Sequence, residues 1–532
     1  MYFRLIKLLR YTRGYMARPI AYLILTATLA AEICMARPGP QNLWQLPVAA
    51  PAPALAQTHA VRPCEALLNS PIGSGVVREA VTIPGSNGAG PWCRVTIEIH
   101  EKSDHPISVW LALPIENWNG RFLGLGGAGW VPGLPFSILL GSSLGFATAA
   151  TNAGREYDAN ISPEALSRLV DDDTFLRDAK GHLDWDKLRN FAYRGVHDMT
   201  VAGKAVTAEF YGVKARYSYF SGCSTGGREG QAEVQRYPDD YDGVMSGSPV
   251  INWAHLGAAQ SWPAAVTSAT REVPQCKLDA AHRAAVAACD ADDGLKDGLV
   301  SQVGSCHFDP RTLIGLHTDC GTIDAQDAEV IRQLWDGPRR SDGSSLWNGT
   351  DRAALLHAST PAPSLDRFEN EGRSLEKPSL ARFESQFNKF VNRYGPTMDT
   401  SDPDVRAFAA HGGKIILWHG VADDVVPAAG TVRYVQSIRE TLGTSATEKF
   451  LRFYEAPGVL HCQGGDGPQP VDLLEPLMMW VEHGQAPTAA RSENWDASGH
   501  TSRTRPLCPY PTHARYNGEG DANDARSFSC VN

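Results

Sequence analysis

The chain has 532 residues, a formal net charge of −10 and no basic excess, which argues against nucleic acid or an anionic membrane as its partner. With 43% hydrophobic and 20% charged residues, it has the composition of a globular protein. Its length exceeds one ordinary compact core, so we expect two domains or one domain with a large insertion.

The first 56 residues differ from the rest. Basic residues up to Arg18 precede an apolar run at 20–31, and a Pro/Ala-rich stretch follows, which is the order of a secretory signal peptide. Ala54-Leu55-Ala56 has the form of a cleavage site, and Met16 is an alternative start. The apolar run is shorter than the ~20 residues that cross a bilayer. We therefore expect export to the periplasm or medium without stable membrane association after leader removal, with a retained anchor as the alternative.

Eleven cysteines are present, and ten remain if Cys34 leaves with the leader. An even number of cysteines in an exported chain is typical of a disulfide framework. The sequence has no CxxC motif or Cys/His cluster, so we expect no zinc site built on cysteine.

Alternating and apolar segments after the leader predict strands that are followed by helices. A glycine-rich stretch, 126–129, follows the third of these strands directly. The predicted strands are 95–99, 107–111, 121–125, 217–220, 414–418 and 450–454, and the predicted helices are 197–211, 228–236 and 430–442. Such alternation predicts an α/β fold with a mostly parallel sheet.

Residues 254–394 interrupt this alternation with four cysteines, an Asp/Gly-rich loop and many helix breakers. We interpret them as a lid domain inserted into an α/β domain. The predicted organisation is a leader at 1–56, the α/β domain at 57–253 and 395–532, and the lid between its two parts.

Gly222-Cys223-Ser224-Thr225-Gly226 matches the G-x-S-x-G nucleophile elbow and lies between a predicted strand and a predicted helix, as this motif requires. The elbow is a strained turn in which glycines leave room for the close approach of the backbone. Ser224 is therefore the candidate nucleophile.

A serine hydroxyl needs a base that is oriented by a carboxylate, and in this fold the chain order is Ser, Asp, His. Asp423 and His461 each follow a predicted strand, in loops where catalytic residues belong. His419 is a competing base, but its position directly at a strand end favours a structural role. The predicted triad is Ser224, Asp423 and His461.

Cys223 precedes the proposed nucleophile and Cys462 follows the proposed base. If bonded, these cysteines would hold the two loops within a few ångströms of each other. This arrangement resembles the tannase and feruloyl esterase family of α/β-hydrolases, which also contains a hydrolase of mono(2-hydroxyethyl) terephthalate. The resemblance spans nearly the whole chain after the leader, through the stretches 118–122, 219–230, 241–243, 289–298, 461–465 and 505–511.

The resemblance implies the α/β-hydrolase fold and a set of disulfides. The implied pairs are Cys223–Cys462, Cys64–Cys93, Cys289–Cys306 and Cys508–Cys530, and Cys276 and Cys320 are left to pair with each other. The oxyanion hole needs the N–H of Thr225 and a second N–H from an earlier loop. Alignment of the family's glycine-rich loop on 126–129 places this second donor at Gly129, with Gly127 and Ala128 as alternatives.

An acidic loop, 290–299, presents carboxylates between turn-forming glycines, which suits Ca²⁺, although it lacks the spacing and closing Glu of an EF-hand. The resemblance implies a structural calcium in the lid. Its implied ligands are the side chains of Asp290, Asp293 and Asp297 and the main-chain carbonyls of Leu295 and Leu299. A solvated acidic turn is the alternative, and no organic cofactor is expected.

The resulting hypothesis is a secreted serine esterase that hydrolyses galloyl, feruloyl or related aromatic esters through an acyl-enzyme. Alternatives are a terephthalate monoester hydrolase, a general carboxylesterase or acyltransferase, a peptide hydrolase, and a non-catalytic protein that binds phenolic ligands. Four aromatic residues in or beside the lid could stack on an aromatic acyl group, although core positions are the stronger interpretation. These residues are Trp253, Trp262, Phe383 and Phe387.

Overall fold

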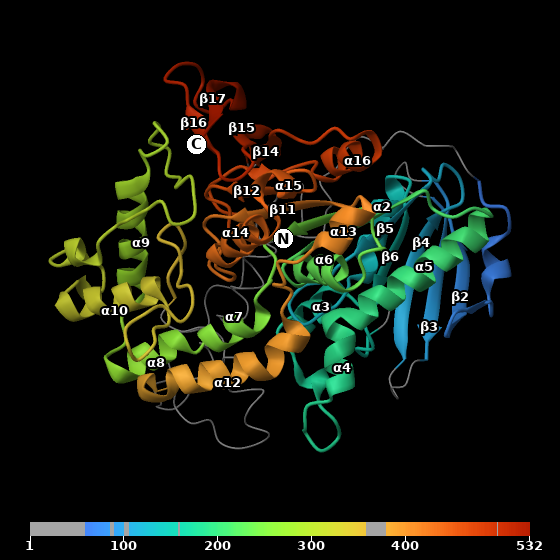
Figure 1. The fold of residues 1–532 in the computed structure, drawn as a ribbon, viewed down its shortest axis with the longest axis horizontal. Coiled ribbons are helices and arrows are strands. Elements are labelled where there is room, and N and C mark those ends of the chain that lie inside the picture. Colours follow the sequence, from blue (N-terminus) through green and yellow to red (C-terminus); the bar gives the residue numbers. More distant parts are fainter. Residues whose placement is uncertain (1–58, 86–89, 101–105, 158–159, 358–378, 497) are drawn as a thin grey trace, which may run out of the picture.

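A computed structural model describes residues 59–85, 90–100, 106–157, 160–357, 379–496 and 498–532 (Figure 1). The predicted leader, with Met16, Cys34 and the cleavage motif, lies outside the described residues. Among the residues described, no helix is both long and apolar enough to cross a membrane.

A ten-stranded mixed sheet is the centre of the fold, with the order β1-β2-β3-β4-β6-β5-β7-β8-β11-β12. Its strands are β1 (Pro71–Ile72), β2 (Gly75–Ile83), β3 (Trp92–Ile99), β4 (Ile107–Pro114), β5 (Arg121–Leu125), β6 (Ala147–Thr151), β7 (Tyr217–Cys223), β8 (Gly243–Gly247), β11 (Lys414–Gly420) and β12 (Leu451–Ala456).

The two halves of this sheet differ in strand direction. From β6 through β5, β7, β8 and β11 to β12 every pair is parallel, whereas β1 to β4 and the β4–β6 pair are antiparallel. The mostly parallel sheet that the sequence predicts is therefore found from β6 to β12, and an antiparallel part precedes it. Strands β1 to β4 follow one another without the crossover helix that parallel neighbours need.

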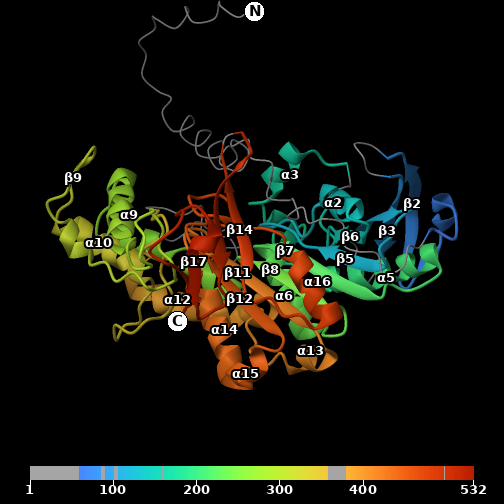
Figure 2. The same cartoon turned by 90° about the horizontal axis from the view of Figure 1, so that it is seen from above.

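Helices cover both faces of the sheet. On one face α5 (Gly195–Tyr211), α6 (Thr225–Arg236) and α14 (Ala429–Leu442) pack on a core that includes Phe122 and Phe220. On the other, α2 (Ile138–Ser143) and α16 (Leu474–His483) pack near Leu123 and Tyr219. Figure 2 shows α5 and α2 on opposite sides of the sheet. Successive strand residues thus face opposite cores, as the period of two requires.

The helices within residues 253–357 and 379–398 form a layer at the end of the molecule opposite β2 and β3 in Figures 1 and 2. These helices pack on one another around a second core, to which Trp253, Trp262, Phe383 and Phe387 all contribute as buried residues. The interpretation of these four aromatic residues as core is confirmed. The helical layer comprises α7 (Trp253–Ala259), α8 (Trp262–Ala269), α9 (Gln275–Cys289), α10 (Ala325–Asp336) and α12 (Leu380–Met398).

The remaining elements are short. They are the strands β9 (His317–Thr318), β10 (Gly321–Thr322), β13 (Gln469–Pro470), β14 (Ala490–Trp495), β15 (Thr501–Leu507), β16 (His513–Tyr516) and β17 (Phe528–Val531), and the helices α3 (Pro163–Leu169), α4 (Trp185–Arg189), α13 (Arg406–His411) and α15 (Thr444–Thr447). Helical turns are η1 (Cys64–Leu67), η2 (Pro135–Ser137), η3 (Thr174–Leu176), η4 (Asn190–Arg194), η5 (Pro310–Leu313) and η6 (Ala525–Ser527).

Five disulfides crosslink the fold, and they are the five expected pairs. The bonds are Cys64–Cys93, Cys223–Cys462, Cys276–Cys320, Cys289–Cys306 and Cys508–Cys530.

Candidate active site

Ser224 occupies the turn between β7 and α6. Its φ of 62° lies in a region that non-glycine residues rarely adopt. The turn is held by a hydrogen bond from the Ser224 N–H to the Gly247 carbonyl, at 2.9 Å. A strained serine at a strand-to-helix turn is the geometry expected of a nucleophile elbow.

The flanking glycines are required by close backbone contacts. A Cβ on Gly222 would lie 2.5 Å from the Gly226 carbonyl carbon, and a Cβ on Gly226 would lie 2.9 Å from the Gly127 oxygen. The elbow therefore packs directly against the glycine-rich loop that follows β5.

Asp423 and His461 meet in a short hydrogen bond. The Nδ1 atom of His461 lies 2.8 Å from Oδ2 of Asp423. Because an ionised carboxylate only accepts, Nδ1 carries the proton, and Nε2 of His461 keeps its lone pair. This is the tautomer that a general base needs. The Asp423 side chain is fully buried, whereas that of His461 is 18% exposed.

Asp423 also accepts from two backbone amides and a second histidine. Its Oδ1 accepts from the N–H groups of Val425 and Val426, and its Oδ2 lies 3.1 Å from Nε2 of His419. Burial alone would raise the pKa of Asp423, but the two histidines and their hydrogen bonds lower it below its usual value. Asp423 is thus held as an anion beside His461.

The charge of Asp423 acts in turn on His461. Burial lowers the pKa of His461, but the Asp423 carboxylate and its hydrogen bond outweigh this effect, so that the pKa is raised overall. His419 is completely buried, and its Nε2 also donates to the Val426 carbonyl at 2.9 Å. These contacts suit the structural role expected of His419.

The Cys223–Cys462 disulfide joins the nucleophile loop to the base loop, with 6.0 Å between the two Cα atoms. One bonded cysteine precedes Ser224 and the other follows His461. The structure thus brings all three predicted triad residues into one region, at the ends of β7, β11 and β12 or in the loops that follow them.

The glycine-rich loop offers three candidates for the second oxyanion donor. The Gly127 N–H donates to Oε2 of Glu229 at 3.0 Å, and the Ala128 N–H donates to the Val131 carbonyl at 2.8 Å. Among the described residues, the Gly129 N–H has no such partner. The Thr225 hydroxyl donates to the Gly129 carbonyl at 2.6 Å, which ties the two expected donor residues together.

Sequence reasoning missed Glu229, which supports this loop. It is fully buried on α6, and burial raises its pKa to about 8. An acidic residue in a predicted amphipathic helix is ordinarily a surface residue, so no pattern singled it out. Its hydrogen bond to the Gly127 N–H positions the glycine-rich loop at 126–129.

The acidic loop follows α9 and is closed by the Cys289–Cys306 disulfide. Asp290 accepts from three backbone amides, and Asp293 accepts from the Leu295 N–H and the Ser301 hydroxyl. In Asp297, Oδ2 pairs with Arg505 at 2.6 Å, while Oδ1 is buried without a hydrogen-bond partner.

An unpartnered buried carboxylate oxygen in an oxygen-rich loop fits a hard cation. In the described part of the chain, however, the three carboxylates do not form a group whose ligand atoms all lie within 4.8 Å of one another.

Comparison with known proteins shows the family to which this chain is similar. The family model described as "Tannase and feruloyl esterase" matches residues 93–367 and 366–531. A probable feruloyl esterase of Arthroderma benhamiae is 36% identical over 80% of this chain and 82% of its own. The mono(2-hydroxyethyl) terephthalate hydrolase of Piscinibacter sakaiensis is 31% identical over 85% of this chain and 87% of its own. The structure of a tannin acyl hydrolase from Aspergillus niger is 25% identical, with a TM-score of 0.74, over 88% of this chain and 94% of that one.

A mixed sheet covered by helices on both faces, with a strained serine after a central strand, is consistent with the α/β-hydrolase fold. The chain belongs to the tannase and feruloyl esterase family. It is accordingly a carboxylic ester hydrolase of the feruloyl esterase and tannase type, which sets aside the alternative of a non-catalytic binding protein.

Proposed function

We propose that this protein is an exported serine esterase that hydrolyses esters of aromatic acids, such as feruloyl or galloyl esters, with Ser224, His461 and Asp423 as its triad. The observation that carries the proposal is the His461–Asp423 hydrogen bond at 2.8 Å, tied by a disulfide to the strained turn at Ser224.

In the first half of the reaction, Nε2 of His461 takes the proton of the Ser224 hydroxyl while the serine oxygen attacks the ester carbonyl. Asp423 stabilises the imidazolium that forms. The alcohol leaves with the proton from His461, and the acyl group stays on Ser224. In the second half, a water molecule gives a proton to His461, attacks the acyl-enzyme and releases the acid.

The oxyanion of each tetrahedral intermediate would be held by the N–H groups of Thr225 and Gly129. Gly129 is favoured over Gly127 and Ala128 because both alternatives donate within the protein. A Cβ on Gly129 would lie 2.4 Å from the Val170 oxygen, and its φ is +54°. The close contact and the positive φ therefore also require glycine at position 129 for steric reasons.

The helical layer corresponds to the predicted lid, residues 254–394. Two residues join the helical layer to the proposed catalytic loops. Val426, in the Asp423 loop, is part of the core of the helical layer, and half-buried Trp130 packs against this core. Trp130 directly follows Gly129 and makes an edge contact with Trp253, with 5.3 Å between ring centroids. An aromatic side chain next to the oxyanion donor suits an aromatic acyl group.

In the lid, a structural calcium would be held by the side chains of Asp290, Asp293 and Asp297 with the carbonyls of Leu295 and Leu299. The ion would neutralise the loop's negative charge and crosslink it. The unpartnered Oδ1 of Asp297 supports this assignment. Export is supported by the five disulfides, which persist in oxidising compartments.

The test is hydrolysis of a panel by the purified protein: methyl ferulate, methyl gallate, chlorogenate, mono(2-hydroxyethyl) terephthalate and p-nitrophenyl acetate. We expect a preference of about 100-fold for a feruloyl or galloyl ester, about 2.7 kcal/mol in transition-state binding. A preference for the terephthalate monoester would establish the second candidate, which the similarity to the Piscinibacter sakaiensis enzyme favours. Activity on the aliphatic ester alone would overturn the aromatic assignment.

A further inference from the structure

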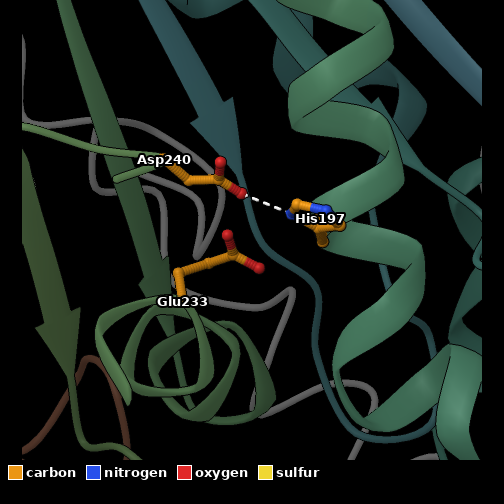
Figure 3. A group of neighbouring side chains, drawn as sticks. All are labelled: His197, Glu233 and Asp240. Carbon is orange, nitrogen blue, oxygen red and sulfur yellow. Dashed lines mark hydrogen bonds and ion pairs between the residues drawn. The ribbon is translucent and has the colours of Figure 1, made fainter. Parts of the chain in front are cut away.

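Three potential metal ligands converge beside the last turn of α6, whose first turn follows Ser224. Figure 3 shows these three side chains. His197 comes from α5, Glu233 from α6 and Asp240 from the loop that precedes β8. Each offers one ligand atom, and these atoms all lie within 4.8 Å of one another. Figure 3 shows the Glu233 carboxylate directed toward the space beside the other two side chains.

Glu233 is the unusual member of this cluster. It is 1% exposed, and neither of its carboxylate oxygens has a hydrogen-bond partner. A buried carboxylate without a hydrogen-bond partner costs free energy because it loses its hydration, and the nearby Lys204 charge offsets only part of that cost. A cation between the carboxylates of Glu233 and Asp240 would relieve both the missing contacts and the repulsion between them.

His197 is held in place for ligation. Its Nδ1 lies 2.6 Å from Oδ2 of Asp240, and its ring stacks on Tyr237 with 3.7 Å between centroids and 8° between planes. The side chains of His197 and Asp240 are 30% and 16% exposed, so the cluster is open to ions from solvent. Lys204 also lies nearby: its Nζ donates to the main-chain oxygen of Asp240 rather than to either carboxylate, but its positive charge acts on both Asp240 and Glu233.

We propose that His197, Glu233 and Asp240 bind one divalent transition-metal ion of the Zn²⁺ type. One imidazole with two carboxylates suits Zn²⁺ rather than Ca²⁺, which prefers oxygen ligands only. In a tetrahedral zinc site with bonds of about 2.0–2.1 Å, neighbouring ligand atoms lie about 3.3 Å apart. On metal binding, the distance between His197 Nδ1 and Asp240 Oδ2 would increase slightly from 2.6 Å, and the Glu233 carboxylate would move toward both atoms. A water molecule would be the fourth ligand.

The site would be structural. Glu233 lies nine residues after Ser224 on α6, which at 1.5 Å per residue is about 13 Å along the helix. The ion would fasten α5, α6 and the loop before β8 to one another. Metal binding should therefore raise the melting temperature without changing the chemistry at Ser224.

The experiment is calorimetric titration of the chelator-treated full chain with ZnCl₂ in excess CaCl₂, followed by thermal unfolding with and without Zn²⁺. The variants are Glu233→Gln and His197→Gln. His255→Gln is the control, because His255 also contacts a carboxylate, Asp399 at 3.2 Å, but lies outside this cluster. Excess calcium is present so that zinc binding to the acidic loop does not contribute to the measured heat.

We expect one zinc ion per wild-type chain and a zinc-dependent rise in melting temperature. Both should persist in His255→Gln. Glu233→Gln and His197→Gln should bind at least about tenfold more weakly and lose the rise. Glu233→Gln should remain folded without metal, since a neutral amide replaces a buried acid, and retained esterase activity verifies this. The proposal is overturned if wild type gains no thermal stability from Zn²⁺, or if Glu233→Gln binds zinc as wild type does.

Discussion

At the scale of single residues, Asp423 serves two histidines, and only one of them is placed to act as a base. His419 donates Nε2–H to Asp423 and Val426 inside the core, with no exposed surface. His461 donates Nδ1–H to the same carboxylate, which leaves the lone pair of its Nε2 free to accept the proton of the Ser224 hydroxyl. In the proposed triad, the same carboxylate would therefore have a structural partner, His419, and a catalytic one, His461.

Exchange of each histidine for glutamine separates these roles. His461→Gln should lower kcat/KM by at least about 10⁴-fold with little change in melting temperature. His419→Gln should keep kcat/KM within about tenfold and lose about 1–3 kcal/mol of stability, because a buried hydrogen-bonded group is disturbed. If His419→Gln lost at least about 10⁴-fold in kcat/KM and His461→Gln stayed within about tenfold, His419 would be the base and His461 the structural histidine.

The raised pKa of His461 predicts the acid side of the pH profile. Below this pKa the imidazole is protonated and cannot take the serine proton, so kcat/KM should fall about tenfold per pH unit as the pH drops. The midpoint should lie above the ordinary 6.5, because Asp423 stabilises the imidazolium. Asp423→Asn should move the midpoint to lower pH and reduce the plateau by about 10⁴-fold. An unmoved midpoint would show that Asp423 does not set this pKa.

At the scale of elements, the Cys223–Cys462 bond aligns two loops that are 239 residues apart in the chain. Cys223→Ser with Cys462→Ser should lower kcat/KM about 100-fold, as expected for a misplaced catalytic pair. The matched control is Cys64→Ser with Cys93→Ser. It should also lower the free energy of unfolding, by about 2–5 kcal/mol, yet keep the wild-type kcat/KM at 25 °C. Equal activity of the two double variants would refute an aligning role.

The acidic loop gives a second prediction at this scale. Chelator treatment should lower the melting temperature of the wild type, and added Ca²⁺ should restore it, because the ion binds the folded loop only. Asp297→Asn should abolish this response. Asp292→Asn, at an exposed position in the same loop, should retain it. A melting temperature that is indifferent to chelator would identify the loop as a plain acidic turn.

At the scale of the whole molecule, the parallel half of the sheet could be predicted and the antiparallel half could not. Strand β11 is buried on both faces along residues 415–418 and reads there as a continuous apolar run. By contrast, β6, Ala147–Thr151, consists only of small residues and shows no pattern, so its pairing between β4 and β5 depends on tertiary contacts. Strands β1 to β4 have no crossover helices between them, so only antiparallel pairing is open to them as neighbours.

The candidate site likewise contains residues that could be predicted from the sequence and residues that could not. Ser224, Asp423 and His461 could be predicted because a local motif, strand ends and cysteine neighbours mark them in the sequence. Glu229 and the cluster around Glu233 carry no local signal, since their burial results from the packing of α6 against α5 and the sheet. Long-range packing therefore decides which acidic residues of a helix are buried.

The most direct test of the central claim is kcat/KM for methyl ferulate and methyl gallate with wild type and Ser224→Ala, with the melting temperature measured on both proteins. We predict an unchanged melting temperature and a loss of at least about 10⁴-fold in hydrolysis, because the nucleophile is removed while the oxyanion donors and the core stay in place. Hydrolysis within tenfold of wild type by the folded variant would contradict the assignment of Ser224 and the acyl-enzyme mechanism with it.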